Sequence, residues 1–127
     1  MIREMVRIKG QWYRIRVKSY TEDKAFSGGE GGTEPKLMGY CDHLIKEIAV
    51  CDLDTHPGFK GEPKKTKRTS EKETLRHEIV HAFFSECGLD YSALQYEGPW
   101  SKNEEMVDWI AIVGPDIYRA WREAGAL

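Results

Sequence analysis

Three residues near the middle of the chain, His77, Glu78 and His81, have the types and the spacing that a catalytic metal site needs. Two histidines four residues apart project from one face of an α-helix, one turn apart, so both imidazoles can bind one Zn²⁺. Glu78 points about 100° round the helix from His77. From there it misses the metal but can take a proton from a metal-bound water as general base. The pattern H-E-x-x-H therefore predicts metal-assisted hydrolysis.

A catalytic zinc takes three protein ligands, and here the third must be a carboxylate because no histidine follows His81. The acidic residues after the motif are Glu86, Asp90, Glu97, Glu104, Glu105 and Asp108. We expect Glu104 to be the ligand, with Glu105 as its rival, because a second predicted helix begins there. Asp108 shares a face with Glu104 and can accept the outward N–H of a ligand histidine, which fixes the imidazole orientation. The alternative role for Glu104 is to cap the helix with Ser101.

Hydrolysis of a peptide bond also needs a group that stabilises the oxyanion of the tetrahedral intermediate. Tyrosines can do this, and Tyr91, Tyr96 and Tyr118 follow the motif. The sequence does not choose among the three, and a packing role is favoured over an oxyanion role for each of them.

The residues after the motif resemble those of a known enzyme group. The stretch Asn103-Glu104-x-x-x-Asp108 is similar to the glutamate helix of the gluzincins, where the Glu binds zinc and the Asp supports a ligand histidine. A closer resemblance is to the small phage and mobile-element metallopeptidases related to the ImmA/IrrE proteins. It covers about residues 37–117 and rests on two short strands, over 38–40 and 47–50, and a charged lead-in into His77.

This resemblance implies one zincin-like metallopeptidase domain over residues 1–127, with Zn²⁺ as cofactor and a peptide or protein as substrate. It implies a phage or prophage enzyme in which an edge strand receives an extended peptide, and we expect residues 47–53 to form that edge. The alternative is a catalytically weak or inactive zincin that acts as a regulatory binding module of the antirepressor or toxin–antitoxin type. A third reading is a purely structural zinc, which a fourth protein ligand such as a cysteine would close.

The second half of the chain is predicted to be helical. A capping box, Ser70-x-x-Glu73, predicts that the active-site helix begins at Ser70, and Gly88 is placed to stop it. A second helix is expected from Ser101 to about residue 113, where Gly114-Pro115 breaks it, and a last helix over 115–124.

The first half is predicted to hold strands. Alternation over 11–17 places Tyr13, Ile15 and Val17 on one face of a strand, and 37–41 and 47–53 form a hairpin. Segments rich in Gly and Pro, about 21–36 and 54–68, are expected to be flexible loops. Strands followed by helices indicate an α+β fold: a small, mostly antiparallel N-terminal sheet packed on the active-site helix and a glutamate helix.

The bulk composition limits the partners. The 127 residues carry a net charge of −2, which predicts no basic face and so no nucleic-acid partner. No apolar run is long enough to cross a bilayer, and the N-terminus lacks the apolar region of a signal peptide. Three cysteines without CxxC spacing indicate reduced thiols. We therefore expect a cytoplasmic protein without a membrane partner.

Overall fold

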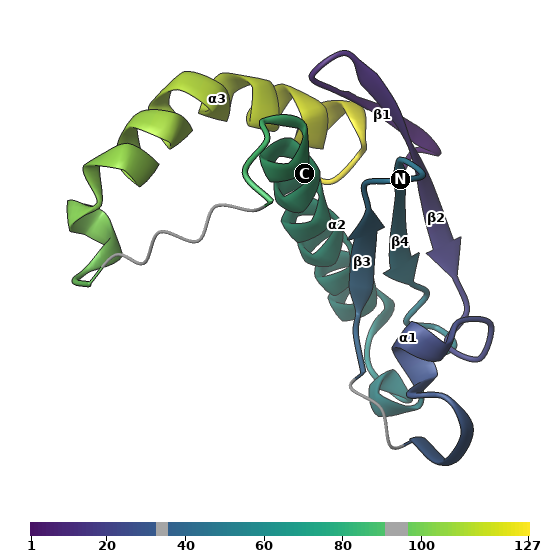
Figure 1. Cartoon of the computed structure of the whole chain (residues 1–127). Helices are drawn as coiled ribbons and strands as arrows, with labels where there is room; N and C mark the ends of the chain where they lie inside the picture. Colours follow the sequence, from purple (N-terminus) through teal and green to yellow (C-terminus); the bar gives the residue numbers. More distant parts are fainter. Residues whose placement is uncertain (33–35, 91–96) are drawn as a thin grey trace.

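A four-stranded mixed sheet at the N-terminal end packs against two long C-terminal helices, so the fold is α+β as predicted (Figure 1). The computed structural model describes residues 1–32, 36–90 and 97–127. The strands are β1 (Met5–Ile8), β2 (Gln11–Lys18), β3 (Gly39–Asp42) and β4 (Glu47–Cys51). Their order in the sheet is β1-β2-β4-β3; β2 and β4 run parallel and the other pairs antiparallel.

Strand β2 confirms the alternation predicted over 11–17, with one exception. Tyr13 and Ile15 are buried, whereas Val17, predicted on the same face, is 47% exposed. The tight turn from β1 to β2 places Lys9 and Gly10 at φ values of 50° and 83°, which pairs Ile8 directly with Gln11.

The β3–β4 hairpin is confirmed, but the prediction that residues 47–53 form the sheet edge is wrong. Strand β4 lies between β2 and β3, and the two edges of the sheet are β1 and β3. Both faces of β4 are covered, because α2 (Lys64–Glu86) packs on one face and Phe26 on the other. Its apolar run, with Ile48 to Cys51 all buried, is therefore that of a central strand.

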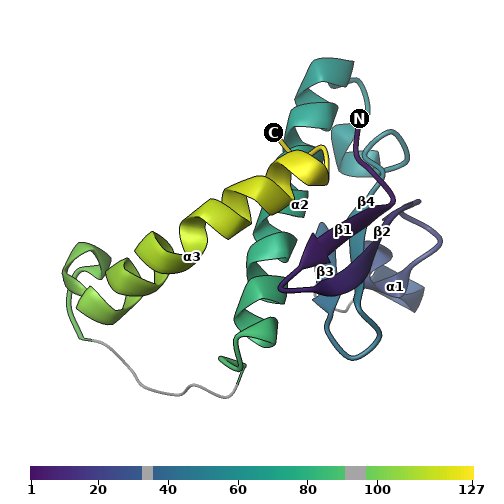
Figure 2. The same cartoon turned by 90° about the horizontal axis from the view of Figure 1, so that it is seen from above.

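A short helix, α1 (Lys24–Ser27), lies in the segment that was expected to be a loop over 21–36, and a 3₁₀ turn follows at Glu30–Gly32. The Asp23 side chain caps α1 by accepting a hydrogen bond from the Ala25 N–H at 2.9 Å. Phe26 is fully buried in a cluster with Ala49 and Cys51 of β4. Helix α1 thus covers the face of the sheet opposite α2 (Figure 2).

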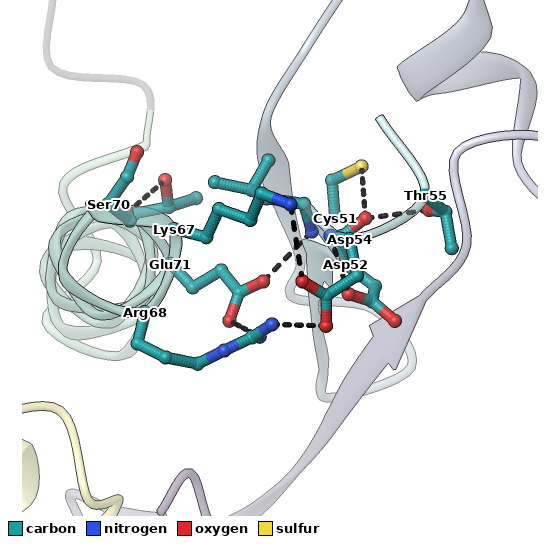
Figure 3. A network of polar contacts seen from close by, with 10 residues as sticks. Cys51, Asp52, Asp54, Thr55, Lys67, Arg68, Ser70 and Glu71 are labelled. Atoms are coloured by element: carbon teal, nitrogen blue, oxygen red, sulfur yellow. Dashed lines mark hydrogen bonds and ion pairs between the residues drawn. The ribbon is translucent and has the colours of Figure 1, made fainter. Parts of the chain in front are cut away.

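Helix α2 begins at Lys64, six residues before the predicted start at Ser70, so the expected loop over 54–68 is wrong beyond Pro63. Tertiary contacts explain this early start (Figure 3). The buried Glu71 accepts a hydrogen bond from the Leu53 N–H at 2.8 Å, and Arg68 pairs with both Glu71 and Asp54. These contacts tie the first turns of α2 to the segment after β4. The end of α2 is as predicted, with Gly88 at φ 75° just beyond Glu86.

Helix α3 is continuous from Glu104 to Glu123, so the predicted start at Ser101 and the predicted break at Gly114-Pro115 are both wrong. Its cap is Asn103, whose side chain accepts a hydrogen bond from the Met106 N–H at 3.1 Å. Pro115 lies inside the helix, and Figure 1 shows that α3 curves along its length. Ala111, whose carbonyl loses its usual partner, is exposed, so water can replace the missing hydrogen bond.

The second half of α3 closes the core. Val113, Ile117 and Ala120 recur at helical spacing, are all buried, and belong to the core cluster that joins the sheet to α2. The Trp121 Nε1–H donates a hydrogen bond to the Arg76 carbonyl of α2 at 3.2 Å. The first half of α3 extends away from the sheet (Figure 2).

Within the described ranges, no helix is long and apolar enough to span a bilayer. The three cysteines, Cys41, Cys51 and Cys87, are free thiols.

Candidate metal centre

His77 and His81 lie one turn apart on the exposed side of α2 and point toward one another. Their Nε2 atoms are 3.1 Å apart and their ring centroids 4.8 Å apart. Two ligands of a tetrahedral zinc are about 3.3 Å apart when each Zn–N bond is about 2.0–2.1 Å. The imidazole pair therefore fits two adjacent corners of a zinc tetrahedron, provided that both rings carry their proton on Nδ1.

Glu78 lies beside this pair but is buried. Its side chain is 9% exposed, against 67% for His77, and its Oε1 lies 4.0 Å from the His77 Nε2. Burial raises the pKa of Glu78, and this outweighs the two histidines, which lower it. Among the described residues no donor hydrogen-bonds the carboxylate. Glu78 is thus placed as a carboxyl that can hold and release a proton next to the histidines.

Strand β3 is what buries Glu78. At Gly39 a Cβ would lie 2.6 Å from Thr74 Cγ2, 2.8 Å from the Ala49 carbonyl oxygen and 3.4 Å from Glu78 Cγ. Only glycine permits this approach, so β3 passes directly over α2. The sequence contained a signal for this, a lone glycine within a predicted strand, but did not show which helix residues it would meet.

A groove of about 470 Å³ leads from His77 and Glu78 toward the N-terminal end of α2. Its lining residues on the strand side are Lys36, Leu37, Met38 and Gly39, and on the helix side Ser70, Glu73 and Thr74. This groove could not be predicted from the sequence, because it forms between two segments about 35 residues apart in the chain.

The structure does not bring the predicted third ligand to the histidines. Glu104, Glu105 and Asp108 are exposed on the first half of α3. Within 1–32, 36–90 and 97–127, no group of three or more His, Cys, Asp or Glu side chains is arranged to hold a metal. The contact that links this half of α3 to α2 is apolar: the Trp109 ring stacks on Phe84 at 4.5 Å.

The other candidate residues have separate partners or lie elsewhere. Glu86 accepts a hydrogen bond from the Tyr13 hydroxyl at 2.6 Å and pairs with Lys46, so it faces the sheet. Asp90 accepts a hydrogen bond from the Ser85 hydroxyl at 2.8 Å. The exposed Tyr118 has the Arg122 guanidinium 5.9 Å from its ring centroid and no hydrogen bond to a described residue. The oxyanion candidates Tyr91 and Tyr96 lie outside the described residues.

Comparisons of this chain with protein-family models, with curated proteins and with solved structures find no match.

Proposed function

We propose that the protein is a zinc-dependent metallopeptidase in which His77 and His81 bind the metal and Glu78 is the general base. One observation carries this proposal: the two Nε2 atoms are 3.1 Å apart, and the buried Glu78 carboxylate lies 4.0 Å from the nearer one.

The roles of the side chains follow from their surroundings. When bound, a zinc ion polarises the substrate carbonyl and lowers the pKa of a coordinated water. Glu78 takes a proton from the attacking water beside His77 and passes it to the leaving amine. The raised pKa of Glu78 brings its carboxyl group closer to the pH at which the protein works. Edge strand β3 leaves part of its backbone N–H and C=O groups unpaired, and an extended peptide can pair there along Glu78.

Glu104 remains our proposed third ligand, with Glu105 as its rival and Asp108 as the residue that orients a ligand histidine. The support is their position at the start of the helix that follows the motif. We also propose that the protein is a phage or prophage enzyme similar to the ImmA/IrrE group. This part of the proposal is supported by the sequence pattern alone.

Zinc binding is the first test. Chelator-stripped protein, titrated with Zn²⁺ in a calorimeter, should bind one ion per chain. His77→Ala and His81→Ala should each weaken zinc binding by about 100-fold or more. Glu104→Ala should also weaken zinc binding, whereas Glu105→Ala should leave it unchanged. The matched control is His43→Ala, which removes a histidine in the β3–β4 turn. Absence of stoichiometric binding by the unaltered protein would overturn the proposal.

Catalysis is the second test. Zinc-loaded protein should hydrolyse peptides from a mixed-sequence library, with the products read by mass spectrometry. Glu78→Gln should bind zinc as tightly as the unaltered protein yet lose hydrolysis by about 10²–10⁴-fold. Equal hydrolysis by both proteins would remove Glu78 from the mechanism.

A second candidate function is a regulatory binding module built on the same site. It is favoured by the first half of α3, where Val107, Ile110 and Ile112 are 44%, 51% and 77% exposed. Of these, Val107 and Ile110 are three residues apart and lie side by side on the helix, and adjacent exposed apolar side chains are typical of protein-binding surfaces. A biological effect that persists in Glu78→Gln, with zinc retained, would favour this function over catalysis.

A further inference from the structure

The groove beside Glu78 has two unlike walls. On the strand side Leu37 is 44% exposed and presents an apolar surface, with Met38 half-buried behind it. On the helix side stand Ser70, Glu73 and Thr74, each one turn or less from the next. The inner end of the groove is Glu78, nine-tenths buried, whose carboxylate has no hydrogen-bond donor among the described residues.

The charges along the groove are predominantly negative. Glu73 is exposed and forms no ion pair with a described residue, one helical turn before His77. The cation of the lining is Lys36, whose Nζ lies 3.8 Å from the position that a Cβ would take on Gly32. The pKa of His56, which lies outside the groove, is lowered mainly by burial and to a smaller extent by the Lys36 charge.

The cations on neighbouring positions of α2 are engaged on another side of the helix. Lys72 donates a hydrogen bond to the Leu127 carbonyl at 2.9 Å, and Arg76 donates one to the Ala126 carbonyl at 2.7 Å. Both side chains therefore turn toward the C-terminus of the chain rather than into the groove. Neither of these two cations of α2 therefore pairs with Glu73.

We propose that this groove selects a lysine or arginine side chain of the peptide substrate, next to the cleaved bond. The methylene stem would lie on Leu37 while the cationic head pairs with Glu73, because long basic side chains pack their stems on apolar surface and keep their charge in water. This inference rests on the proposed peptidase function and names the substrate class for it. A peptide paired with the free edge of β3 presents every second side chain to this groove.

Binding of peptides to metal-free protein tests the groove without requiring turnover. The probes are fluorescein-labelled ten-residue peptides of one neutral sequence that carry Lys, norleucine or Glu at a single central position. Fluorescence anisotropy should show the Lys peptide binding about fivefold more tightly than the norleucine peptide, as one partly shielded ion pair provides. The Glu peptide should bind more weakly than both.

Variants at Glu73 locate the effect, and the fold tolerates them because this side chain is exposed. Glu73→Gln should bind the Lys and norleucine peptides equally, and Glu73→Lys should reverse the order in favour of the Glu peptide. The matched control is Glu4→Gln, which removes an exposed carboxylate beside β1 and should leave the preference unchanged. An unchanged preference in Glu73→Lys, or no binding of any peptide, would overturn the proposal.

Cleavage of the same peptides separates this inference from the function on which it rests. If the zinc-loaded protein binds the Lys peptide preferentially but cleaves no peptide, the peptidase proposal fails and the basic-residue groove stands. If it cleaves all three peptides with equal kcat/KM, the peptidase proposal stands and the groove proposal fails.

Discussion

Gly39 of the edge strand lies so close to Glu78 of α2 that a Cβ on the glycine would be 3.4 Å from the Glu78 Cγ. The same Cβ would be 2.6 Å from Thr74 Cγ2 and 2.8 Å from the Ala49 carbonyl oxygen. One missing side chain therefore sets the separation of the sheet edge from α2. That separation both buries Glu78 and forms one wall of the groove.

Gly39→Ala should destabilise the protein by about 1–3 kcal/mol, because the added methyl group pushes β3 away from backbone that cannot yield. Urea denaturation of the purified variant measures the loss. The control is Gly114→Ala: its Cβ would meet nothing closer than Ile110 Cγ2 at 3.9 Å, so it should gain about 0.5–1 kcal/mol from helix propensity. A Gly39→Ala protein as stable as the unaltered one would show that the strand can move.

Glu78→Gln should stabilise the metal-free protein above acidic pH. Burial raises the pKa of Glu78 in the folded state, so the folded protein binds its proton more tightly than the unfolded chain. Stability then falls as pH rises from the ordinary carboxyl pKa, about 4.3, through the raised folded value. The variant lacks this loss, so its advantage should appear across that window and vanish below it.

Urea denaturation in the presence of a chelator, from pH 4 to pH 7, measures this difference. An advantage of the variant that does not change with pH would contradict the assignment to Glu78 ionisation. Greater stability combined with lost hydrolysis would mark Glu78 as a residue kept for function at the expense of the fold.

Tyr13→Phe should destabilise the protein at neutral pH and less so in acid. Burial acts to raise the pKa of Glu86, but hydrogen bonds from Lys46 and Tyr13 outweigh it and hold the pKa below its ordinary value. Glu86 therefore contributes stability above its ordinary pKa, which is lost as pH falls through the lowered folded value. Phenylalanine keeps the buried ring but removes the hydroxyl donor.

The expected loss at pH 7 is about 1.5–3 kcal/mol, the value of a hydrogen bond to a charged group. Denaturation curves between pH 2 and pH 7 should show the two proteins converging toward the acid end. The exposed Tyr118→Phe is the control and should change stability by less than about 0.5 kcal/mol. Parallel pH profiles for Tyr13→Phe and the unaltered protein would contradict the contribution of Glu86.

Pro115→Ala should raise the melting temperature, because alanine restores the N–H that can bond to the Ala111 carbonyl inside α3. The expected gain is about 1–2 kcal/mol, reduced from the full cost of an interior proline by the greater freedom of the unfolded chain. The control is Pro57→Ala, since Pro57 begins a 3₁₀ turn where proline fits, and this variant should gain nothing. A lower melting temperature for Pro115→Ala would show that the curve in α3 is needed for packing.

Features that depend on neighbours within a few residues could be predicted from the amino-acid sequence. The H-E-x-x-H spacing placed His77 and His81 on one face, and the structure holds their Nε2 atoms 3.1 Å apart. The alternation in β2, the β3–β4 hairpin and the stop at Gly88 were also predictable, because hydrophobic period and turn chemistry are local properties.

Contacts between distant segments determine which strands form the edges of the sheet, where α2 begins and whether Pro115 breaks a helix. Hydrophobicity placed β4 in the sheet but not its order, and pairing with β2 made it central. The ties from Glu71 to the Leu53 N–H and Arg68 extend α2 back to Lys64, and the buried stripe through Ile117 carries α3 past its proline. In each case burial and long-range hydrogen bonds outweigh a local signal of about 1–3 kcal/mol.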